Sequence, residues 1–187
     1  GNVLIFLNTY GSLYSIDISS SKINWFVNLN QSTNTNANNL YNGSEVVIDK
    51  DKVILSSNRS THVFNINTGA EIFKKNFSTN IKPIIINNYL FIITKNDLLI
   101  SIDINNGKII YSYNLNKRVA EFTNTQKKKI EVKNVMILNN NIFIFLKNSY
   151  FLKLDINGNI VNIDKLPSKI KSQPILIDKS LLYLDKN

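Results

Sequence analysis

The chain has 187 residues, of which 43% are hydrophobic and 19% are charged, and its formal net charge is +9. This is the composition of a globular protein, and the absence of cysteine excludes disulfide frameworks, thiolate metal sites and cysteine nucleophiles. No apolar run approaches the ~18 residues that a transmembrane helix needs, so we expect no membrane span in this chain.

The positive charge comes almost entirely from lysine. Asn, Ile and Lys together supply 81 residues, which is the usage of a very AT-rich coding sequence, whereas only Arg59 and Arg118 are arginine. Surfaces that recognise phosphate groups favour arginine, because its planar fork binds two oxygens at once. We therefore interpret the lysines as solvated surface and expect no specific nucleic-acid partner.

Four segments share one apolar pattern that closes on Asp or Asn. In chain order they are residues 13–18, 61–66, 99–104 and 151–156, and the shared polar position holds Asp17, Asn65, Asp103 and Asp155. A turn follows each segment, with Gly69 and Gly107 in the second and third copies. An apolar segment then places Trp25, Phe73 and Tyr111 in one register, and the fourth copy has drifted. Repeats of about 40–50 residues are typical of propeller blades.

Pairs of β-branched segments joined by tight turns accompany these repeats. In chain order they are 45–48 with 53–55, 83–86 with 89–93, 135–138 with 142–146, and 174–177 with 181–184. Asn, Asp and Gly at the turns tolerate the positive φ that short hairpins require. No segment shows helical periodicity, so we expect no helix.

The pattern therefore predicts an all-β protein, a β-propeller of four-stranded antiparallel blades. The chain enters at the second strand of one blade, continues through three full blades, and reaches the second strand of a fifth, so we expect 17 strands. We expect a single partial propeller domain with blade pieces at about 1–30, 43–78, 79–116, 132–166 and 170–187.

The repeat resembles the PQQ-like, or quinoprotein, propeller repeat, which follows the pattern L-Y-A-L-D-x-x-T-G-x-x-x-W. The resemblance covers nearly the whole chain, although Trp occurs only at Trp25 and the Thr-Gly pair only at residues 68–69. It implies that Trp25, Phe73 and Tyr111 dock neighbouring blades. It also implies that about four blades are present here, as part of a seven- or eight-bladed propeller.

Two kinds of family member define the functional expectations. Quinoprotein dehydrogenases hold their quinone between a vicinal cysteine pair and a Trp, beside Ca²⁺, but this chain lacks cysteine and Trp25 stands at a docking position. The propeller lipoprotein of outer-membrane β-barrel assembly is non-catalytic and binds partners. The resemblance therefore implies a non-enzymatic protein-binding scaffold of the bacterial envelope, periplasmic or outer-membrane-associated, without a cofactor. The alternatives are a fragment of a PQQ-dependent dehydrogenase and a ligand-sensing propeller of a surface or lumenal receptor.

Two long connections are the candidate partner-binding segments. Residues 30–43 are polar, with Leu40 and Tyr41 as anchors, and residues 117–133 combine an aromatic with basic residues: Arg118, Phe122, Lys127 and Lys128. Insertions this long in a compact repeat are usually functional or disordered. We predict that they bind a protein, possible partners being outer-membrane assembly components, and the alternative is a solvated loop.

Other polar residues favour structural roles. Asp17, Asp103 and Asp155 recur around a ring and cannot converge on one ion, so we interpret them as acceptors for turn N–H groups, as Asn65 can also be. His62 has no carboxylate nearby in the sequence, which favours a structural histidine. Apolar flanks of the end blades would be exposed, and they predict a homodimer through blade edges.

Overall fold

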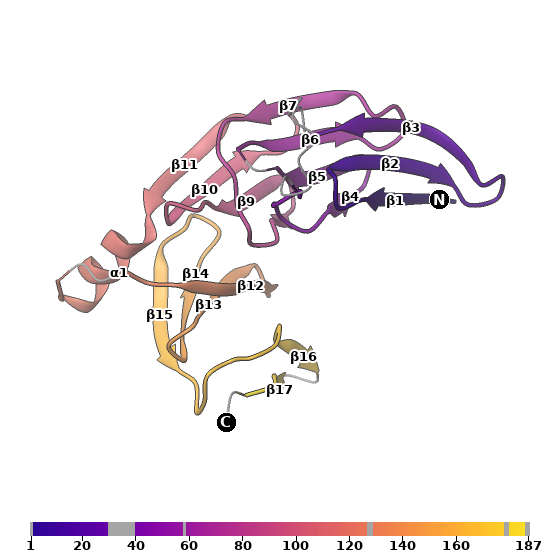
Figure 1. The fold of residues 1–187 in the computed structure, drawn as a ribbon. Helices are drawn as coiled ribbons and strands as arrows, with labels where there is room; N and C mark the ends of the chain where they lie inside the picture. Colours follow the sequence, from indigo (N-terminus) through magenta and orange to yellow (C-terminus); the bar gives the residue numbers. More distant parts are fainter. Residues whose placement is uncertain (1, 30–39, 58, 127–128, 178–179, 186–187) are drawn as a thin grey trace.

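The computed structural model describes residues 2–29, 40–57, 59–126, 129–177 and 180–185. Within these ranges the chain forms 17 strands and one helix, and every sheet is antiparallel with its strands in chain order (Figure 1). The predicted β-propeller of four-stranded antiparallel blades is confirmed.

The sheets follow one another along the chain. The first sheet contains β1 (Val3–Leu7), β2 (Ser12–Asp17) and β3 (Lys22–Asn28). The second contains β4 (Val47–Asp49), β5 (Lys52–Ser56), β6 (Thr61–Asn65) and β7 (Glu71–Lys75). The third contains β8 (Ile84–Ile86), β9 (Tyr89–Ile93), β10 (Leu98–Asp103) and β11 (Ile109–Asn114). The fourth contains β12 (Val132–Leu138), β13 (Asn141–Leu146), β14 (Tyr150–Leu154) and β15 (Ile160–Lys165). The last hairpin contains β16 (Ile175–Ile177) and β17 (Ser180–Leu182).

The prediction that the chain has no helix is wrong. Helix α1 (Leu115–Thr123) lies between the third and fourth sheets in the sequence and covers part of the connection that was expected to be a loop. The run Leu-Asn-Lys-Arg-Val-Ala-Glu contains mostly good helix formers, but it is too short to show a clear helical period.

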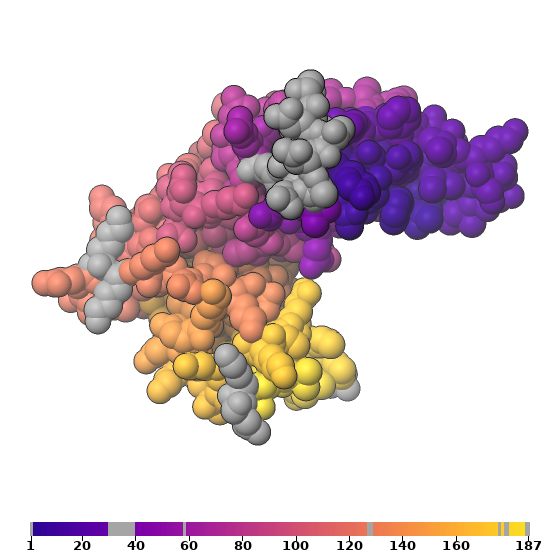
Figure 2. Space-filling model, viewed as in Figure 1, coloured from indigo at the N-terminus to yellow at the C-terminus, as the bar shows by residue number. Residues whose placement is uncertain are grey.

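Neighbouring sheets stack face to face along an open arc, with the first sheet at one end and the last hairpin at the other (Figures 1 and 2). Successive side chains of β5 point to opposite faces of the sheet and pack against two different neighbouring sheets. Val53 and Leu55 join a hydrophobic cluster with Leu13 of the first sheet, whereas Ile54 joins one with Leu90 of the third. Because all three side chains are fully buried, the core is a series of layers between blades.

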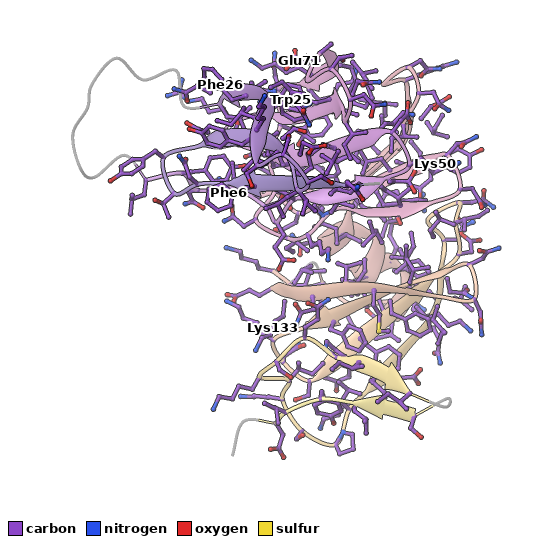
Figure 3. The ribbon with its side chains drawn as sticks, turned by 90° about the vertical axis from the view of Figure 1, so that its right-hand side faces the viewer. Phe6, Trp25, Phe26, Lys50, Glu71 and Lys133 are labelled. Atoms are coloured by element: carbon purple, nitrogen blue, oxygen red, sulfur yellow. The ribbon has the colours of Figure 1, made fainter. Side chains whose placement is uncertain are left out.

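The fourth sheet makes the corresponding contact with the last hairpin. Phe145 of β13 is buried there with Leu166 and Ile170, and Leu181 packs against them. Polar contacts reinforce this layer, because the Lys133 ammonium in β12 donates to the Ile170 and Lys171 carbonyls (Figure 3). The hairpin is therefore attached to the fourth sheet on one face.

One β-bulge recurs at the same place in all four larger sheets. The register between the last two strands of each sheet shifts after Ser15, Val63, Ser101 and Lys153. The residue opposite each of these positions is respectively Trp25, Phe73, Tyr111 and Asn162. A bulge adds local twist and redirects the side chain beside it, so it aims the outer-strand aromatic.

Each of these aromatics lies over a glycine of the next blade. A Cβ added at Gly69 would lie 2.6 Å from the Trp25 ring, and one added at Gly107 would lie 2.8 Å from the Phe73 ring. Gly158 lies against the Tyr111 ring in the same way, with 2.8 Å to its nearest atoms. All three glycines have positive φ, which glycine adopts without strain.

Candidate protein-binding surface

Helix α1 is capped at both ends by asparagine. The Asn114 side chain accepts a hydrogen bond from the Lys117 N–H at 3.1 Å. Asn124 has φ 50, in the left-handed region, and its N–H donates to the Ala120 and Glu121 carbonyls. These caps satisfy backbone groups that a nine-residue helix would leave unpaired, and they fix its ends.

A buried polar contact attaches α1 to the third sheet. Asn116 is 7% exposed; its Nδ2 donates to Asp97 Oδ2 at 2.9 Å, and its Oδ1 accepts from the Ile130 N–H at 2.8 Å. The neighbouring Leu115 is fully buried in the layer between the third and fourth sheets. The helix is therefore held by the β9–β10 turn on one side and by the following segment on the other.

The outward face of α1 carries Lys117, Arg118, Glu121 and Phe122. We call these four residues the α1 face. Arg118 lies over the Tyr113 ring at 4.9 Å, and its guanidinium is 4.0 Å from the Glu121 carboxylate. Phe122 is 47% exposed. Burial raises the pKa of Tyr113, whose hydroxyl donates to the Gly158 carbonyl. An exposed ring thus lies on the same helix as a positioned cation, a combination that can accept an apolar side chain beside an acidic group.

The predicted binding residues do not form one site. Arg118 and Phe122 lie together on α1, whereas Lys127 and Lys128 lie outside the described residues. Leu40 and Tyr41 belong to the connection between the first and second sheets, in another part of the arc.

Leu40 and Tyr41 themselves face different surroundings. Leu40 is 55% exposed. Tyr41 packs against the layer between the first two sheets, donates its N–H to the Thr9 carbonyl at 2.8 Å, and donates its hydroxyl to the Ser56 carbonyl. Tyr41 is therefore partly buried and hydrogen-bonded through both its N–H and its hydroxyl, whereas Leu40 is exposed.

The recurring acidic positions bind their own turns. Asp17 accepts from the Ser20 N–H at 2.7 Å, Asp103 accepts from the Asn105 N–H at 2.9 Å, and Asp155 accepts from the Asn159 N–H at 2.8 Å. Asn65 accepts from the Asn67 and Thr68 N–H groups in the same way. The hydrogen bonds that Ser20 donates from its N–H and its hydroxyl hold the pKa of Asp17 below its usual range. Within the described ranges, no three His, Asp or Glu side chains are grouped to hold a metal ion.

His62 has a carboxylate neighbour in the fold, although none lies close to it in the sequence. Its Nδ1 lies 2.8 Å from Glu71 Oε2, and its Nε2 lies 3.3 Å from Ser57 Oγ. Nine residues separate His62 from Glu71 in the sequence, and the β6–β7 pairing brings them together. The register shift after Val63 places Glu71 opposite Phe64, two residues from His62 along β6, so a regular hairpin register would not have indicated the pair.

The Ser57–His62–Glu71 series has the order of a catalytic triad but a structural geometry. The Ser57 hydroxyl donates to the Ser60 carbonyl at 3.1 Å, and its oxygen accepts from the Ser60 N–H at 3.3 Å. In a triad the serine proton is directed at the histidine instead. Ser57 and His62 are also buried, so these groups fasten the β5–β6 turn to β7.

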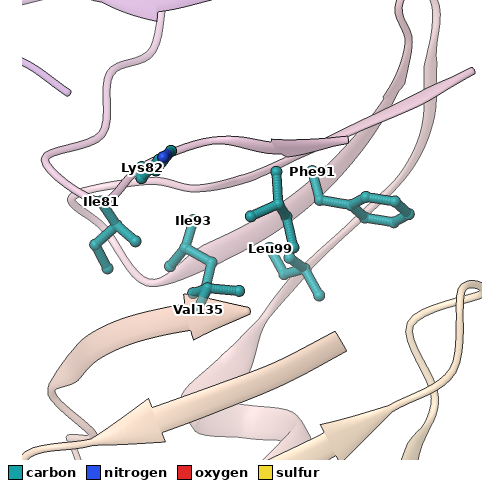
Figure 4. A pocket seen from close by; sticks show the side chains of 7 residues that line it. Ile81, Lys82, Phe91, Ile93, Leu99 and Val135 are labelled. Atoms are coloured by element: carbon teal, nitrogen blue, oxygen red, sulfur yellow. The ribbon is translucent and has the colours of Figure 1, made fainter. Parts of the chain in front are cut away.

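A small hollow lies between the third and fourth sheets (Figure 4). Its lining is apolar apart from one residue: Ile81, Lys82, Ile84, Phe91, Ile93, Leu99 and Val135. Its volume of about 10 Å³ is the space of about one water molecule.

In the part of the chain that the structure describes, no helix has the length and apolar character to cross a membrane.

The stacked four-stranded sheets, their shared bulge and the aromatic–glycine contacts define a β-propeller built from PQQ-like repeats. The family model of the outer membrane protein assembly factor BamB matches residues 1–113, and the chain belongs to this family. The predicted family resemblance is therefore confirmed. No curated protein matches the sequence.

Solved structures share the fold at low sequence identity. BamB from Moraxella catarrhalis is 11% identical with a TM-score of 0.54, and the match covers 99% of this chain and 64% of that one. The β-propeller domain of Cps50 (Swd1) from Myceliophteria thermophila is 11% identical with a TM-score of 0.70, covering 99% and 59%. The quinohemoprotein alcohol dehydrogenase ADHIIG from Pseudomonas putida HK5 is 11% identical with a TM-score of 0.61, covering 88% and 33%. The chain spans less than two thirds of each, and these likenesses show the fold alone.

Proposed function

We propose that the protein is a non-enzymatic scaffold of the bacterial envelope that binds another protein through the α1 face. The observation that carries this proposal is an exposed Phe122 and a positioned Arg118 on a helix inserted between two blades. Membership of the BamB family supports an envelope location, periplasmic or outer-membrane-associated. A component of outer-membrane β-barrel assembly is the partner that this family name favours.

The α1 face would lose little conformational entropy when it binds a partner. Large aromatic and arginine side chains supply most of the affinity at protein interfaces, provided that they are already held in place. The Tyr113 ring and the Glu121 carboxylate restrain Arg118, and the buried Asn116 fixes the helix beneath it. Phe122 projects from this fixed base, so the loss of conformational entropy on binding is small.

A capture experiment with matched variants tests the proposal. The immobilised chain is incubated with solubilised bacterial envelope proteins at ~150 mM salt, where the Debye length is about 8 Å and long-range charge is screened. We expect recovery of a β-barrel assembly component, and loss of that recovery in Arg118→Ala/Phe122→Ala. The control is Tyr150→Ala/Lys165→Ala, which removes a second exposed aromatic with a lysine 6.0 Å from its ring, in the fourth sheet.

Two results would contradict the proposal. If both double variants lose the bound protein equally, binding does not depend on the α1 face. If only acidic proteins or nucleic acid are recovered, and they are released as the salt concentration rises, the net charge of +9 acts without specificity.

A further inference from the structure

Three asparagines in this chain are followed directly by glycine: Asn42, Asn106 and Asn157. In such a pair the glycine nitrogen can approach the amide carbon of the asparagine side chain, because glycine has no Cβ to hinder the approach. Attack by this nitrogen is one reason why asparagine is a thermolabile residue. The three pairs are alike in the sequence, but they have different surroundings in the fold.

The first two pairs are restrained. In the turn after β10, Asn106 Nδ2 donates to Asp103 Oδ2 at 3.0 Å, and Asn106 Oδ1 accepts from the Lys108 N–H at 2.8 Å. Both hydrogen bonds have to break before the amide carbon can turn toward the nitrogen of the next residue. In the other pair the glycine itself is confined, since a Cβ added at Gly43 would lie 1.9 Å from the Ser56 carbonyl oxygen.

Asn157 lies in the turn between β14 and β15, and its side chain is not restrained in this way. It is exposed, and within the described ranges its side chain makes no hydrogen bond. Asp155, which corresponds to Asp103, instead accepts from the N–H and the side chain of Asn159 at 2.8 and 3.0 Å. In both turns the glycine N–H donates to the aspartate carbonyl, at 2.8 Å after β10 and 3.0 Å after β14. The two turns therefore differ mainly in the asparagine side chain.

The same turn is where the third sheet docks on the fourth (Figure 1). Tyr111 Oη donates to the Ile156 carbonyl at 3.1 Å, and the Tyr113 hydroxyl donates to the Gly158 carbonyl. Asn157 is the residue between these two carbonyls. The Tyr111 ring also lies over Gly158, where an added Cβ would be 2.8 Å from it. Docking of both tyrosines therefore depends on the length of the main chain at Asn157.

We propose that Asn157 is a site of spontaneous deamidation, and that isoaspartate formed there releases the docking of the third sheet on the fourth. The Gly158 nitrogen forms a bond to Asn157 Cγ, the Cγ–Nδ2 bond breaks, and ammonia leaves with the proton of the Gly158 N–H. Water then opens the resulting succinimide. Opening at Cγ gives aspartate, and opening at the main-chain carbonyl gives isoaspartate, so one water is consumed for each ammonia released.

Isoaspartate would disrupt this docking because it lengthens the main chain. The extra carbon adds a bond of about 1.5 Å between the two acceptor carbonyls. The donor–acceptor distance of a hydrogen bond varies by only a few tenths of an ångström, so Tyr111 and Tyr113 cannot keep both acceptors. Aspartate keeps the normal chain length and leaves the docking intact. Because Arg118 lies over the Tyr113 ring at 4.9 Å, the release extends to helix α1.

Ageing of the 187-residue chain in warm, mildly alkaline buffer tests the chemistry. Peptide mapping by mass spectrometry locates the deamidated residue, and labelling by a protein isoaspartyl methyltransferase measures isoaspartate. We expect Asn157 to react roughly tenfold faster than Asn106, because two hydrogen bonds oppose the reaction at Asn106. Asn157→Gln should remove the fast reaction, because the longer side chain forms a ring less readily, whereas Asn106→Gln should retain it.

Urea unfolding of the aged protein tests the effect on docking. The deamidated fraction is isolated by ion exchange, and its isoaspartate content is measured by the same label. We expect its unfolding midpoint to fall to lower urea concentration in proportion to that content. Asn157→Asp is the matched control, because it carries the new charge on a main chain of normal length, and it should unfold as the fresh protein does. Aged Asn157→Gln should also keep the midpoint of the fresh protein.

Three outcomes overturn the proposal. Equal rates at Asn106 and Asn157 show that the side-chain hydrogen bonds do not control the reaction. If Asn157 stays intact while a synthetic peptide of residues 151–163 is modified, the folded turn protects it. If the isoaspartate fraction unfolds at the midpoint of the fresh protein, docking does not depend on the length of this turn.

Discussion

Replacing Gly69 by alanine tests whether the blades depend on the aromatic–glycine contact. The new Cβ would lie 2.6 Å from Trp25 Cδ2, and the backbone there has φ +71. The ring cannot move away without cost, because Trp25 Nε1 donates to the Ile66 carbonyl at 2.8 Å. The substitution therefore strains the backbone and displaces the ring at once.

The free energy of unfolding should fall by about 2–4 kcal/mol. A left-handed conformation costs an alanine about 1–2 kcal/mol, and forcing an extra carbon into a packed contact costs about 1–3 kcal/mol. Alanine also reduces the entropy of the unfolded chain, which returns about 0.4–1 kcal/mol to the stability. Ser21→Gly is the matched control, because Ser21 also has positive φ and follows Asp17 by four residues, as Gly69 follows Asn65, and no described sheet places an aromatic over it. It should change stability by less than about 1 kcal/mol.

Urea unfolding measured by circular dichroism supplies these values, and Trp25, the single tryptophan, reports the ring by its fluorescence. When Trp25 is already alanine, the same Gly69→Ala change should cost only the backbone strain less the entropy returned by alanine, about 1 kcal/mol. If Gly69→Ala costs equally much with and without the indole ring, the ring does not restrict this position. The proposed docking role of the aromatic–glycine contact would then be refuted.

Two further predictions concern α1 and alkaline stability. Asn116→Ala should leave Asp97 without its partner and lower the free energy of unfolding by about 1–3 kcal/mol. Limited proteolysis of this variant should then cut first within residues 115–126. Cleavage elsewhere would contradict the anchoring role of Asn116. Burial raises the pKa of Tyr113, so the unfolded chain loses this proton near pH 10 while the folded chain keeps it. The free energy of unfolding should therefore fall above about pH 10, and it should fall less steeply in Tyr113→Phe. Urea unfolding between pH 9 and 11 measures both slopes of this free energy against pH, and equal slopes would show that Tyr113 does not contribute.

The sequence was sufficient for the blades because their strands are marked locally. The turn residues with positive φ, such as Asn87 and Gly107, stand where the hairpin pattern placed turns, and β-branched segments flank them. The repeated aspartate fixed the phase between blades. These signals depend on a few neighbouring residues, so they survive without knowledge of the tertiary structure.

The remaining features depend on contacts that local patterns do not reveal. The bulge that aims Trp25 is a register shift between strands, and composition cannot predict it. The helix was missed because α1 is short and its main attachment is polar, from Asn116 to Asp97. The His62–Glu71 pair forms across a hairpin, where sequence distance hides proximity. Burial of Tyr41 likewise follows from packing that its polar, repetitive neighbours do not indicate.

The layered arrangement has a consequence for how the protein is made. The hydrogen bonds that join one sheet to the next span modest sequence distances, such as 41 residues from Trp25 to Ile66 and 45 residues from Tyr111 to Ile156. Each blade can therefore close on the one before it soon after it leaves the ribosome, without waiting for distant parts of the chain. Synthesis would then extend the folded protein one layer at a time, and each new layer would cover the apolar face of the layer before it.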